Sequence, residues 1–296
     1  VPFKDIKTVY VDEVQDRIYV GAHAGGMMVL HRKSGYIEYY NRHNSNLPSN
    51  NIYSIISDGY GGLWVASLEY LLHFDIDKRN FTIVDVDGDG HKLQQYNRLL
   101  FCDSKKRIWA GGEMGISVFN QVGTSLLPNT DFQIASVLKQ AFVNCFYETS
   151  SGYLWIGTRN GLFALKESDK QFLQYTTENG LPSNVIYGIL EDAYGRLWIS
   201  TNQGLSCLNS ESGKFRNFTI MDGLQGNQFN AGAYCRKDNG YMLFGGVNGI
   251  TSFRPETLID NPYAPKPVIN KLFVHNKEVL PDDETGILKE SITYVN

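Results

Sequence analysis

The stretch Asp192-Ala193-Tyr194-Gly195-Arg196-Leu197-Trp198-Ile199-Ser200 combines a polar turn with a short apolar segment, and its pattern recurs along the chain. All four tryptophans fall at one position of the repeat, which we call the anchor: Trp64, Trp109, Trp155 and Trp198. Tyr19 stands at the anchor of the first copy and Leu243 at that of the sixth. Successive anchors lie 45, 45, 46, 43 and 45 residues apart, so the chain is organised as six copies of one unit.

Each copy predicts four short β-strands, most clearly the fifth, with strands expected over 185–191, 196–201, 205–209 and 214–219. Asp/Gly and Ser/Gly turns separate them, since Asp caps a turn and Gly accepts a positive φ. Four antiparallel strands repeated every 40 to 50 residues or so are typical of the blades of a β-propeller. We therefore predict an all-β propeller of four-stranded blades, with the anchors packed between neighbouring blades.

Composition supports an all-β domain and excludes some partners. Aromatic residues make up 13% of the 296 residues, and the formal net charge is −4. Because there is no basic excess, we expect no nucleic acid as a partner. No apolar run is long enough for a membrane span, and Val1-Pro2-Phe3 does not begin a signal peptide, so we expect a piece of a longer protein. The four cysteines lack CxxC spacing and are expected to be unpaired thiols.

The pattern becomes irregular at two connectors and stops after the sixth copy. The connectors over 85–95 and 121–133 are irregular, and we expect such insertions on one face of the ring. The sixth copy has no fourth strand, and a proline-rich linker follows at 260–267. We predict a strand over 268–274 that turns at 275–277 into a second strand. The expected division is therefore a propeller over 1–259, the linker, and the start of a second β-domain over 268–296.

Two motifs carry a resemblance to a known family. Leu-Trp-Ile-Gly-Thr-x-x-Gly-Leu at 154–162 and Gly-Leu-Pro-Ser-Asn at 180–184 resemble the regulator-propeller repeat. Such repeats form the periplasmic sensor regions of hybrid two-component histidine kinases in gut Bacteroidetes. Gln228-Phe229-Asn230 with the stretch 245–253 resembles the last blade of that family. Lys266 onward resembles the start of its triple-tyrosine immunoglobulin-like domain.

The resemblance implies a periplasmic sensor that detects an oligosaccharide and signals to the expression of polysaccharide-utilisation genes. The intact protein would be a homodimer with two seven-bladed propellers, the immunoglobulin-like domain, a membrane span, a kinase and a DNA-binding regulator. With six blades where the family has seven, we expect an open or incomplete arc for this chain.

The residues themselves give no support for catalysis. The six histidines lack His-x-His or HExxH spacing, and neither a Gly-x-Ser-x-Gly elbow nor a phosphate loop is present in the sequence. Asp-x-x-Gly-x-Leu-Trp is similar to the Asp-box of sialidase propellers, where it is a structural turn. We expect this region not to be an enzyme and to need no cofactor.

One stretch matches the opening of a calcium-binding loop. Asp85, Asp87 and Asp89 stand at its first, third and fifth positions, with Gly90 at the sixth. The twelfth position is Tyr96, where a bidentate Glu belongs. The alternative is a solvated acidic turn.

For ligand binding we consider the start of each first strand together with the turn before each third strand, because both lie on one face of a blade. The candidates are Tyr53, Glu69, Tyr70, Tyr96, Asn97, Arg98, Glu113, Asn144, Arg159, Asn160, Asn202, Gln203, Gln228 and Asn230. Aromatic rings with amide and guanidinium donors suit a sugar, and Arg98 or Arg159 would pair with an acidic one. The alternative is a non-catalytic scaffold that binds protein, including a second copy of the receptor.

Overall fold

The computed structural model describes residues 4–84, 97–131, 133–139, 141–166, 171–210, 212–258, 271–280 and 287. These residues form antiparallel sheets that follow one another in sequence order, and a separate hairpin. The chain divides into two compact units, Val1–Pro255 and Glu256–Asn296. The first unit holds the six repeats, and we number its sheets blade 1 to blade 6.

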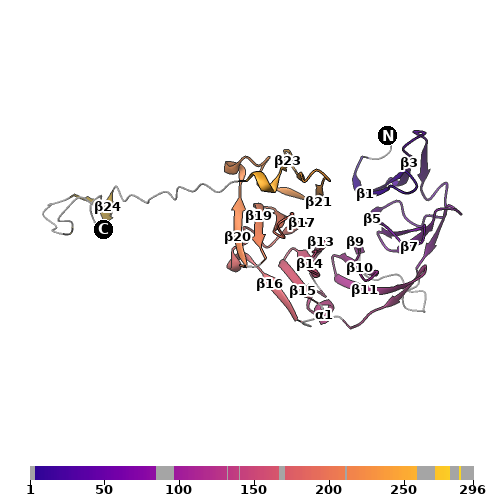
Figure 1. Cartoon of the computed structure of the whole chain (residues 1–296), viewed down its shortest axis with the longest axis horizontal. Helices are drawn as coiled ribbons and strands as arrows, with labels where there is room; N and C mark the ends of the chain where they lie inside the picture. Colours follow the sequence, from indigo (N-terminus) through magenta and orange to yellow (C-terminus); the bar gives the residue numbers. More distant parts are fainter. Residues whose placement is uncertain are drawn as a thin grey trace. The chain divides into compact units, whose positions relative to one another are not determined.

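Each blade is a meander in which consecutive strands pair. Blades 1 to 3 comprise β1 (Ile6–Asp12), β2 (Arg17–Ala22), β3 (Gly26–His31), β4 (Ile37–Tyr40); β5 (Ile52–Ser57), β6 (Leu63–Ser67), β7 (Leu71–Asp75), β8 (Asn80–Ile83); and β9 (Asn97–Cys102), β10 (Arg107–Gly112), β11 (Gly115–Val122), β12 (Ser125–Pro128). Blades 4 to 6 comprise β13 (Val143–Glu148), β14 (Tyr153–Thr158), β15 (Gly161–Lys166), β16 (Gln171–Tyr175); β17 (Ile186–Glu191), β18 (Leu197–Thr201), β19 (Gly204–Asn209), β20 (Lys214–Phe218); and β21 (Phe229–Arg236), β22 (Met242–Gly246), β23 (Gly249–Phe253). Figure 1 shows the blades following one another around an arc with blades 1 and 6 at its ends.

The predicted fold class is confirmed. The four strands predicted for the fifth copy agree with β17 to β20 within one or two residues, and within the described residues blade 6 has three strands, as expected. The prediction for the connector over 121–133 was wrong, because this segment contains the end of β11 and all of β12. Four residues ending in proline give little strand pattern, yet Leu126 is buried among blades 2 and 3 and fixes the strand there. The other irregular connector, over 85–95, lies outside the described residues.

The anchors pack between neighbouring blades, which confirms their predicted role. Trp64 lies in a cluster with Leu100 and Ile108 of blade 3, and Trp198 lies with Phe229 and Met242 of blade 6. Trp109 and Trp155 contact the following blade in the same way. A single sheet cannot bury both faces, so each large ring closes the face that its own blade leaves open.

In blades 1, 3, 4 and 5, the glycine that begins the third strand is required by two constraints, which Gly204 illustrates. Its φ is +112°, a backbone conformation that is strained for any residue with a side chain. A Cβ added there would also lie 2.3 Å from the carbonyl oxygen of Phe218, at the end of β20. Its N–H donates to the carbonyl oxygen of Asn227, in the connector that leads to blade 6, over 2.7 Å. Gly26 and Gly161 donate in the same way to Asn50 and Asn184, so in blades 1, 4 and 5 the turn before the third strand is bonded to the connector that leaves the same blade.

Helical segments are short. They are α1 (Gln133–Val137) and the 3-10 turns η2 (Thr177–Asn179), η3 (Ile220–Asp222) and η4 (Pro255–Thr257). In the described part of the chain, none has both the length and the hydrophobicity that crossing a membrane requires.

The described part of the second unit is mainly a hairpin of β24 (Leu272–Val274) and β25 (Lys277–Val279). The turn predicted at 275–277 is present, and its central residues His275 and Asn276 both have positive φ, at 50° and 61°. Such a two-residue turn matches the twist of the strands that it joins.

Candidate functional site: a cross-blade cluster on the entry face

Because consecutive strands of a blade are antiparallel, the loops of each blade lie alternately on two opposite faces. The start of the first strand and the turn between the second and third strands lie on one face, which we call the entry face. The turns between the first and second strands, and between the third and fourth, lie on the other, which we call the turn face. The candidate ligand residues of the sequence belong to the entry face.

A β-bulge interrupts the first strand at the entry face in each of the first five blades. The pairing register shifts at Lys7, Tyr53, Arg98, Asn144 and Tyr187. A bulge adds one residue to one strand and re-aims its side chain. Four kinds of side chain occupy this position, with tyrosine in both blades 2 and 5, although the backbone that presents them repeats. The scaffold thus offers one variable side chain per blade on this face.

A second variable position lies four residues after the anchor, in the turn before the third strand. His23, Glu113, Arg159 and Asn202 occupy it in blades 1, 3, 4 and 5. The sequence analysis selected three of these and missed His23. The fixed distance from Tyr19 is the signal that would have found it.

Side chains from these two positions meet across the first three blades. The Tyr53 hydroxyl oxygen and His23 Nδ1 are 3.4 Å apart, and their rings are 6.3 Å apart. The guanidinium carbon of Arg98 lies 5.0 Å from the centre of the Tyr53 ring, a cation–π contact. Arg98 Nη2 also pairs with Glu113 Oε1 at 2.6 Å. We call these four residues the entry-face cluster.

The ion pair between Arg98 and Glu113 is exposed enough for a ligand to replace one of its two members. The Arg98 and Glu113 side chains are 39% and 36% exposed, and an ion pair this exposed contributes little to stability. Arg98 Nε is buried and has no hydrogen-bond partner among the described residues. An incoming hydroxyl or carboxylate can compete with Glu113 for the exposed part of the guanidinium.

Blades 4 and 5 add a second group of polar side chains. The guanidinium carbon of Arg159 lies 3.8 Å from the centre of the Phe142 ring. Asn202 Oδ1 is buried and has no partner within the described part of the chain. By contrast, Asn144 Nδ2 donates to the carbonyl oxygen of Ile186 over 2.7 Å and so links blade 4 to blade 5.

The structure places the remaining candidates as follows. Tyr70 packs partly buried against the core between blades 1 and 2, which leaves less of its ring to a ligand. Glu69 shares its turn, between β6 and β7, and Gln228 accepts a hydrogen bond at its carbonyl from Gln225 Nε2. The side chains of Asn160, Gln203 and Asn230 are exposed on the loops and strand that carry them. The backbone of Asn97 begins β9, while Tyr96 and the calcium-loop candidates Asp85, Asp87 and Asp89 lie outside the described residues.

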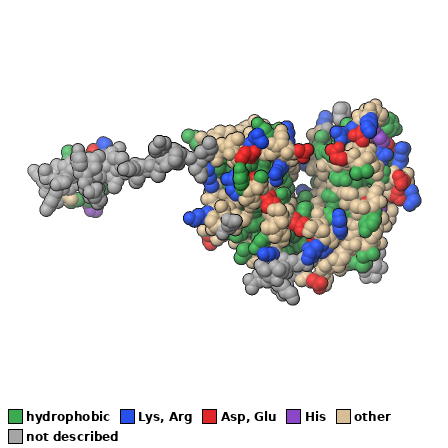
Figure 2. All heavy atoms as spheres, viewed as in Figure 1, with side chains coloured by type: hydrophobic (Ala, Val, Ile, Leu, Met, Phe, Trp, Pro, Cys, Tyr) green, Lys and Arg blue, Asp and Glu red, His purple; other side chains and the backbone are tan. Residues whose placement is uncertain are grey.

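Metal-ligating, thiol and charged side chains are distributed as follows over the described residues. Among the residues that the structure describes, no group of three or more His, Cys, Asp or Glu side chains is arranged to hold a metal ion. Cys145 is fully buried, and burial raises the pKa of its thiol to about 12, so this thiol is protonated at neutral pH. Figure 2 shows acidic and basic side chains interspersed over the face in view, without an extended patch of one sign.

The fold and the cluster together define a repeat propeller with a variable polar face. Comparison with known sequences makes the class specific. The family described as "Two component regulator propeller" matches residues 46–69, 138–160 and 180–203. The chain therefore carries two-component regulator propeller repeats, as the resemblance in the sequence indicated.

One curated relative and two solved structures illustrate the similarity. Histidine kinase P4 of Formosa agariphila is 28% identical over 231 residues, which cover 75% of this chain and 17% of that protein. The extracellular domain of a hybrid two component system from B. thetaiotaomicron is 20% identical with a TM-score of 0.67, over 96% of this chain and 44% of that one. A virginiamycin B lyase from Staphylococcus aureus is 14% identical with a TM-score of 0.64, over 85% of this chain and 81% of the lyase. The chain thus spans less than half of the two sensor-related proteins, and at these identities the solved structures share its fold alone.

Proposed function

We propose that this chain is an extracytoplasmic ligand-sensing region of a hybrid two-component histidine kinase. The regulator-propeller repeats and the similarity to a histidine kinase support the assignment. In the intact protein, a change on the propeller would pass through the following β-unit to a kinase on the other side of a membrane. The proposed location is the periplasm.

The proposed ligand is an oligosaccharide held on the entry face. The observation that carries this proposal is the cluster of His23, Tyr53, Arg98 and Glu113, which joins three blades through one aromatic ring and three polar or charged groups. Sugars present apolar faces to rings and hydroxyl edges to donors and acceptors, so this combination suits them. Because the cluster joins three blades, a ligand held there favours one arrangement of those blades over others.

A thermal-shift screen tests the ligand class. Neutral and uronic-acid oligosaccharides are added to the wild-type chain and to Arg98→Ala, with Arg216→Ala on β20 as a control remote from the entry-face cluster. A sugar that binds raises the midpoint of unfolding of the wild type and of the control, and raises it much less in Arg98→Ala. A ligand-induced shift that is unchanged in Arg98→Ala would place the binding site elsewhere.

The competing proposal is a propeller that binds only protein, including a second copy of the receptor. If no oligosaccharide shifts the midpoint and the chain elutes as a dimer, the scaffold proposal is favoured. The two proposals thus predict opposite outcomes in the same pair of measurements.

A further inference from the structure

Blades 3 and 5 contain the same three-residue network on the turn face. In blade 5, Asp192 Oδ2 accepts from Arg196 Nε over 2.7 Å and from the indole nitrogen of Trp198 over 3.0 Å. In blade 3, Asp103 Oδ2 accepts from the equivalent arginine and tryptophan over 2.6 and 2.8 Å. In both blades a buried carboxylate therefore lies between a guanidinium and the donor on the anchor ring.

Blade 1 has the donors of this network in the same register. Arg17 stands two residues before the anchor Tyr19, as Arg196 stands two residues before Trp198. Tyr19 is 0% exposed, and among the described residues its hydroxyl has no acceptor for its proton, because the Arg17 guanidinium beside it is only a donor. Within the same part of the chain, Arg17 forms no ion pair. Burial raises the pKa of the Tyr19 hydroxyl and outweighs the hydrogen bond and the charge of Arg17, which lower it, so at neutral pH this group keeps its proton.

The equivalent carboxylate of blade 1, Asp12, does not complete the network. The turn of blade 1 is one residue longer, with seven residues from Asp12 to Tyr19 where six separate Asp192 from Trp198. Asp12 Oδ1 accepts from the backbone N–H groups of Val14 and Gln15, both over 3.0 Å. Among the described residues, no hydrogen bond or ion pair joins Asp12 to Arg17 or Tyr19, although the charge of Asp12 helps to raise the pKa of the Tyr19 hydroxyl.

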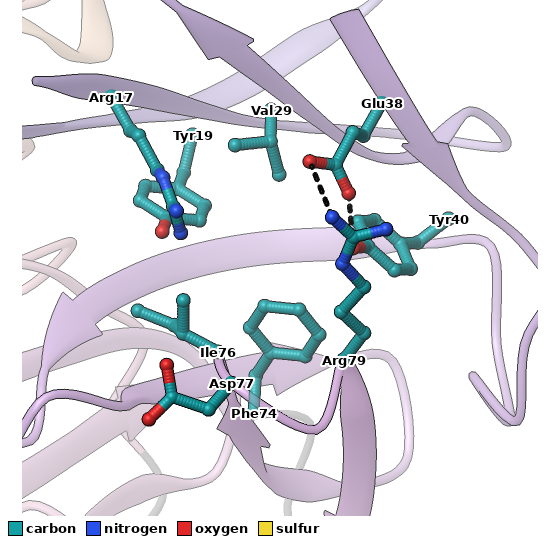
Figure 3. Close-up of a pocket in the computed structure, with 9 residues that line it drawn as sticks. All are labelled: Arg17, Tyr19, Val29, Glu38, Tyr40, Phe74, Ile76, Asp77 and Arg79. Atoms are coloured by element: carbon teal, nitrogen blue, oxygen red, sulfur yellow. Dashed lines mark hydrogen bonds and ion pairs between the residues drawn. The ribbon is translucent and has the colours of Figure 1, made fainter. Parts of the chain in front are cut away.

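A cavity of about 150 Å³ lies beside these donors, between blades 1 and 2. Figure 3 shows Arg17 and Tyr19 on one side of it and Asp77 across from them. Glu38, Tyr40 and Arg79 lie together at its other end. A cavity of this volume holds a molecule of about the size of benzene, which is ample for a small carboxylate.

The charges around the cavity decide which ligand it suits. Glu38 is already occupied, since its two oxygens accept from His31 Nε2 at 2.6 Å and from the Tyr40 hydroxyl at 2.7 Å, and Arg79 lies 3.6 Å away. Asp77 is exposed, so its charge is largely screened by solvent. At this end the cavity therefore presents two donors, the buried Tyr19 hydroxyl and the half-buried Arg17 guanidinium.

We propose that the cavity between blades 1 and 2 binds a small carboxylate, which accepts from Arg17 and from the Tyr19 hydroxyl in the manner of the aspartates of blades 3 and 5. The bound carboxylate supplies the acceptor that Asp12 does not provide. The site lies on the turn face and is independent of the sugar site proposed on the entry face. With one guanidinium and one hydroxyl as donors, the dissociation constant is expected to be about millimolar.

The test is a titration of the labelled chain with sodium acetate, followed through the Nε–H resonances of its arginines at constant ionic strength. The Arg17 signal should shift and saturate, while the Arg196 signal should not move, because Asp192 fills the equivalent position. Acetamide, which has the shape of acetate without its charge, should give no saturable shift. Linear shifts of equal size at Arg17 and Arg196 would overturn the proposal.

Three variants assign the contacts. Tyr19→Phe removes only the hydroxyl and should weaken acetate binding about ten-fold, the equivalent of one hydrogen bond to a charged group. Arg17→Gln should abolish binding, and Arg196→Gln serves as its matched control with unchanged affinity. Asp77→Asn removes the one screened negative charge that faces the donors and should strengthen binding. An affinity that is unchanged in Tyr19→Phe, or weakened by Asp77→Asn, contradicts the proposed geometry.

Discussion

The two faces of the propeller use their repeated backbone in opposite ways. On the turn face, one carboxylate recurs in blades 2, 3 and 5, where Asp58, Asp103 and Asp192 are buried and cap the same turn. On the entry face, the bulged position of the first strand holds lysine, tyrosine, arginine, asparagine and again tyrosine in blades 1 to 5. The buried carboxylate thus repeats on the turn face, whereas the same backbone presents side chains of several kinds on the entry face. We infer that the turn face provides stability and that the entry face is free to specify a ligand.

The largest expected effect is the loss of an anchor. Trp198 is 1% exposed and packs on blade 6, so Trp198→Ala should lower the free energy of unfolding by about 3 to 5 kcal/mol. Chemical denaturation measures the change. Tyr194→Ala in the neighbouring turn, where the side chain is 67% exposed, is the control and should stay within about 0.5 kcal/mol of wild type. Equal losses for the two variants would contradict the packing role of the anchor.

The next largest effect separates blade 5 from blade 1. Asp192→Ala leaves the Arg196 guanidinium and the indole N–H of Trp198 without their acceptor and should cost about 3 kcal/mol. Asp12→Ala removes only a turn cap and should cost about 1 kcal/mol. Urea denaturation of both variants measures the difference. If Asp12→Ala proved as costly as Asp192→Ala, the two turns would be equivalent after all.

A smaller effect concerns the dependence of stability on pH in blade 1. Burial acts to raise the pKa of Glu38, but hydrogen bonds from Tyr40 and His31 and the Arg79 charge together hold it below its ordinary value of 4.5. A carboxylate with a lowered pKa stabilises the fold at pH values above 4.5, and this contribution is lost as the pH falls through the folded-state pKa. Glu38→Gln should therefore lose stability at neutral pH and show a flatter decline below pH 4.5.

Denaturation of wild type and Glu38→Gln across this range measures the slope. The same slope in both proteins would show that other carboxylates govern acid unfolding. Glu13→Gln, whose partner Arg32 is 41% exposed, is a suitable control because that ion pair is open to solvent.

The smallest effect on stability is expected on the entry face. Arg98→Ala removes an exposed ion pair and a cation–π contact and should change the free energy of unfolding by about 1 kcal/mol or less. Chemical denaturation measures it against Trp198→Ala. A loss comparable to that of the anchor variant would show that the cluster is part of the scaffold.

The repeating parts of the fold were predicted well, because a pattern that recurs six times is easily recognised in the sequence. The anchors, the glycine turns and the strands of blade 5 follow one pattern, and the structure has them where the period places them. The non-repeating parts were predicted less well. The strand β12 was not predicted because Ser125-Leu126-Leu127-Pro128 is too short to show a strand pattern. It is held as a strand by the burial of Leu126 between blades. His23 was missed because its selection requires counting from a tyrosine anchor in place of a tryptophan.

The bulges could not be predicted at all, since a bulge is a shift between two paired strands and leaves no mark in either strand alone. The cavity beside Arg17 is likewise a product of pairing between blades. In the sequence, the only sign of this site is the extra residue between Asp12 and Tyr19. That residue can be interpreted only after the structure has shown that Asp192 accepts a hydrogen bond from Trp198.

The most direct test of the division between the two faces is a thermal-shift experiment that compares Arg98→Ala with Trp198→Phe, using the oligosaccharide that stabilises the wild type most. Our account predicts that Arg98→Ala keeps the midpoint of the free protein and loses most of the ligand-induced shift. Trp198→Phe should lower the midpoint of the free protein and keep the ligand-induced shift. The opposite pattern, with ligand response lost in Trp198→Phe and retained in Arg98→Ala, would contradict the claim that recognition lies on the entry face.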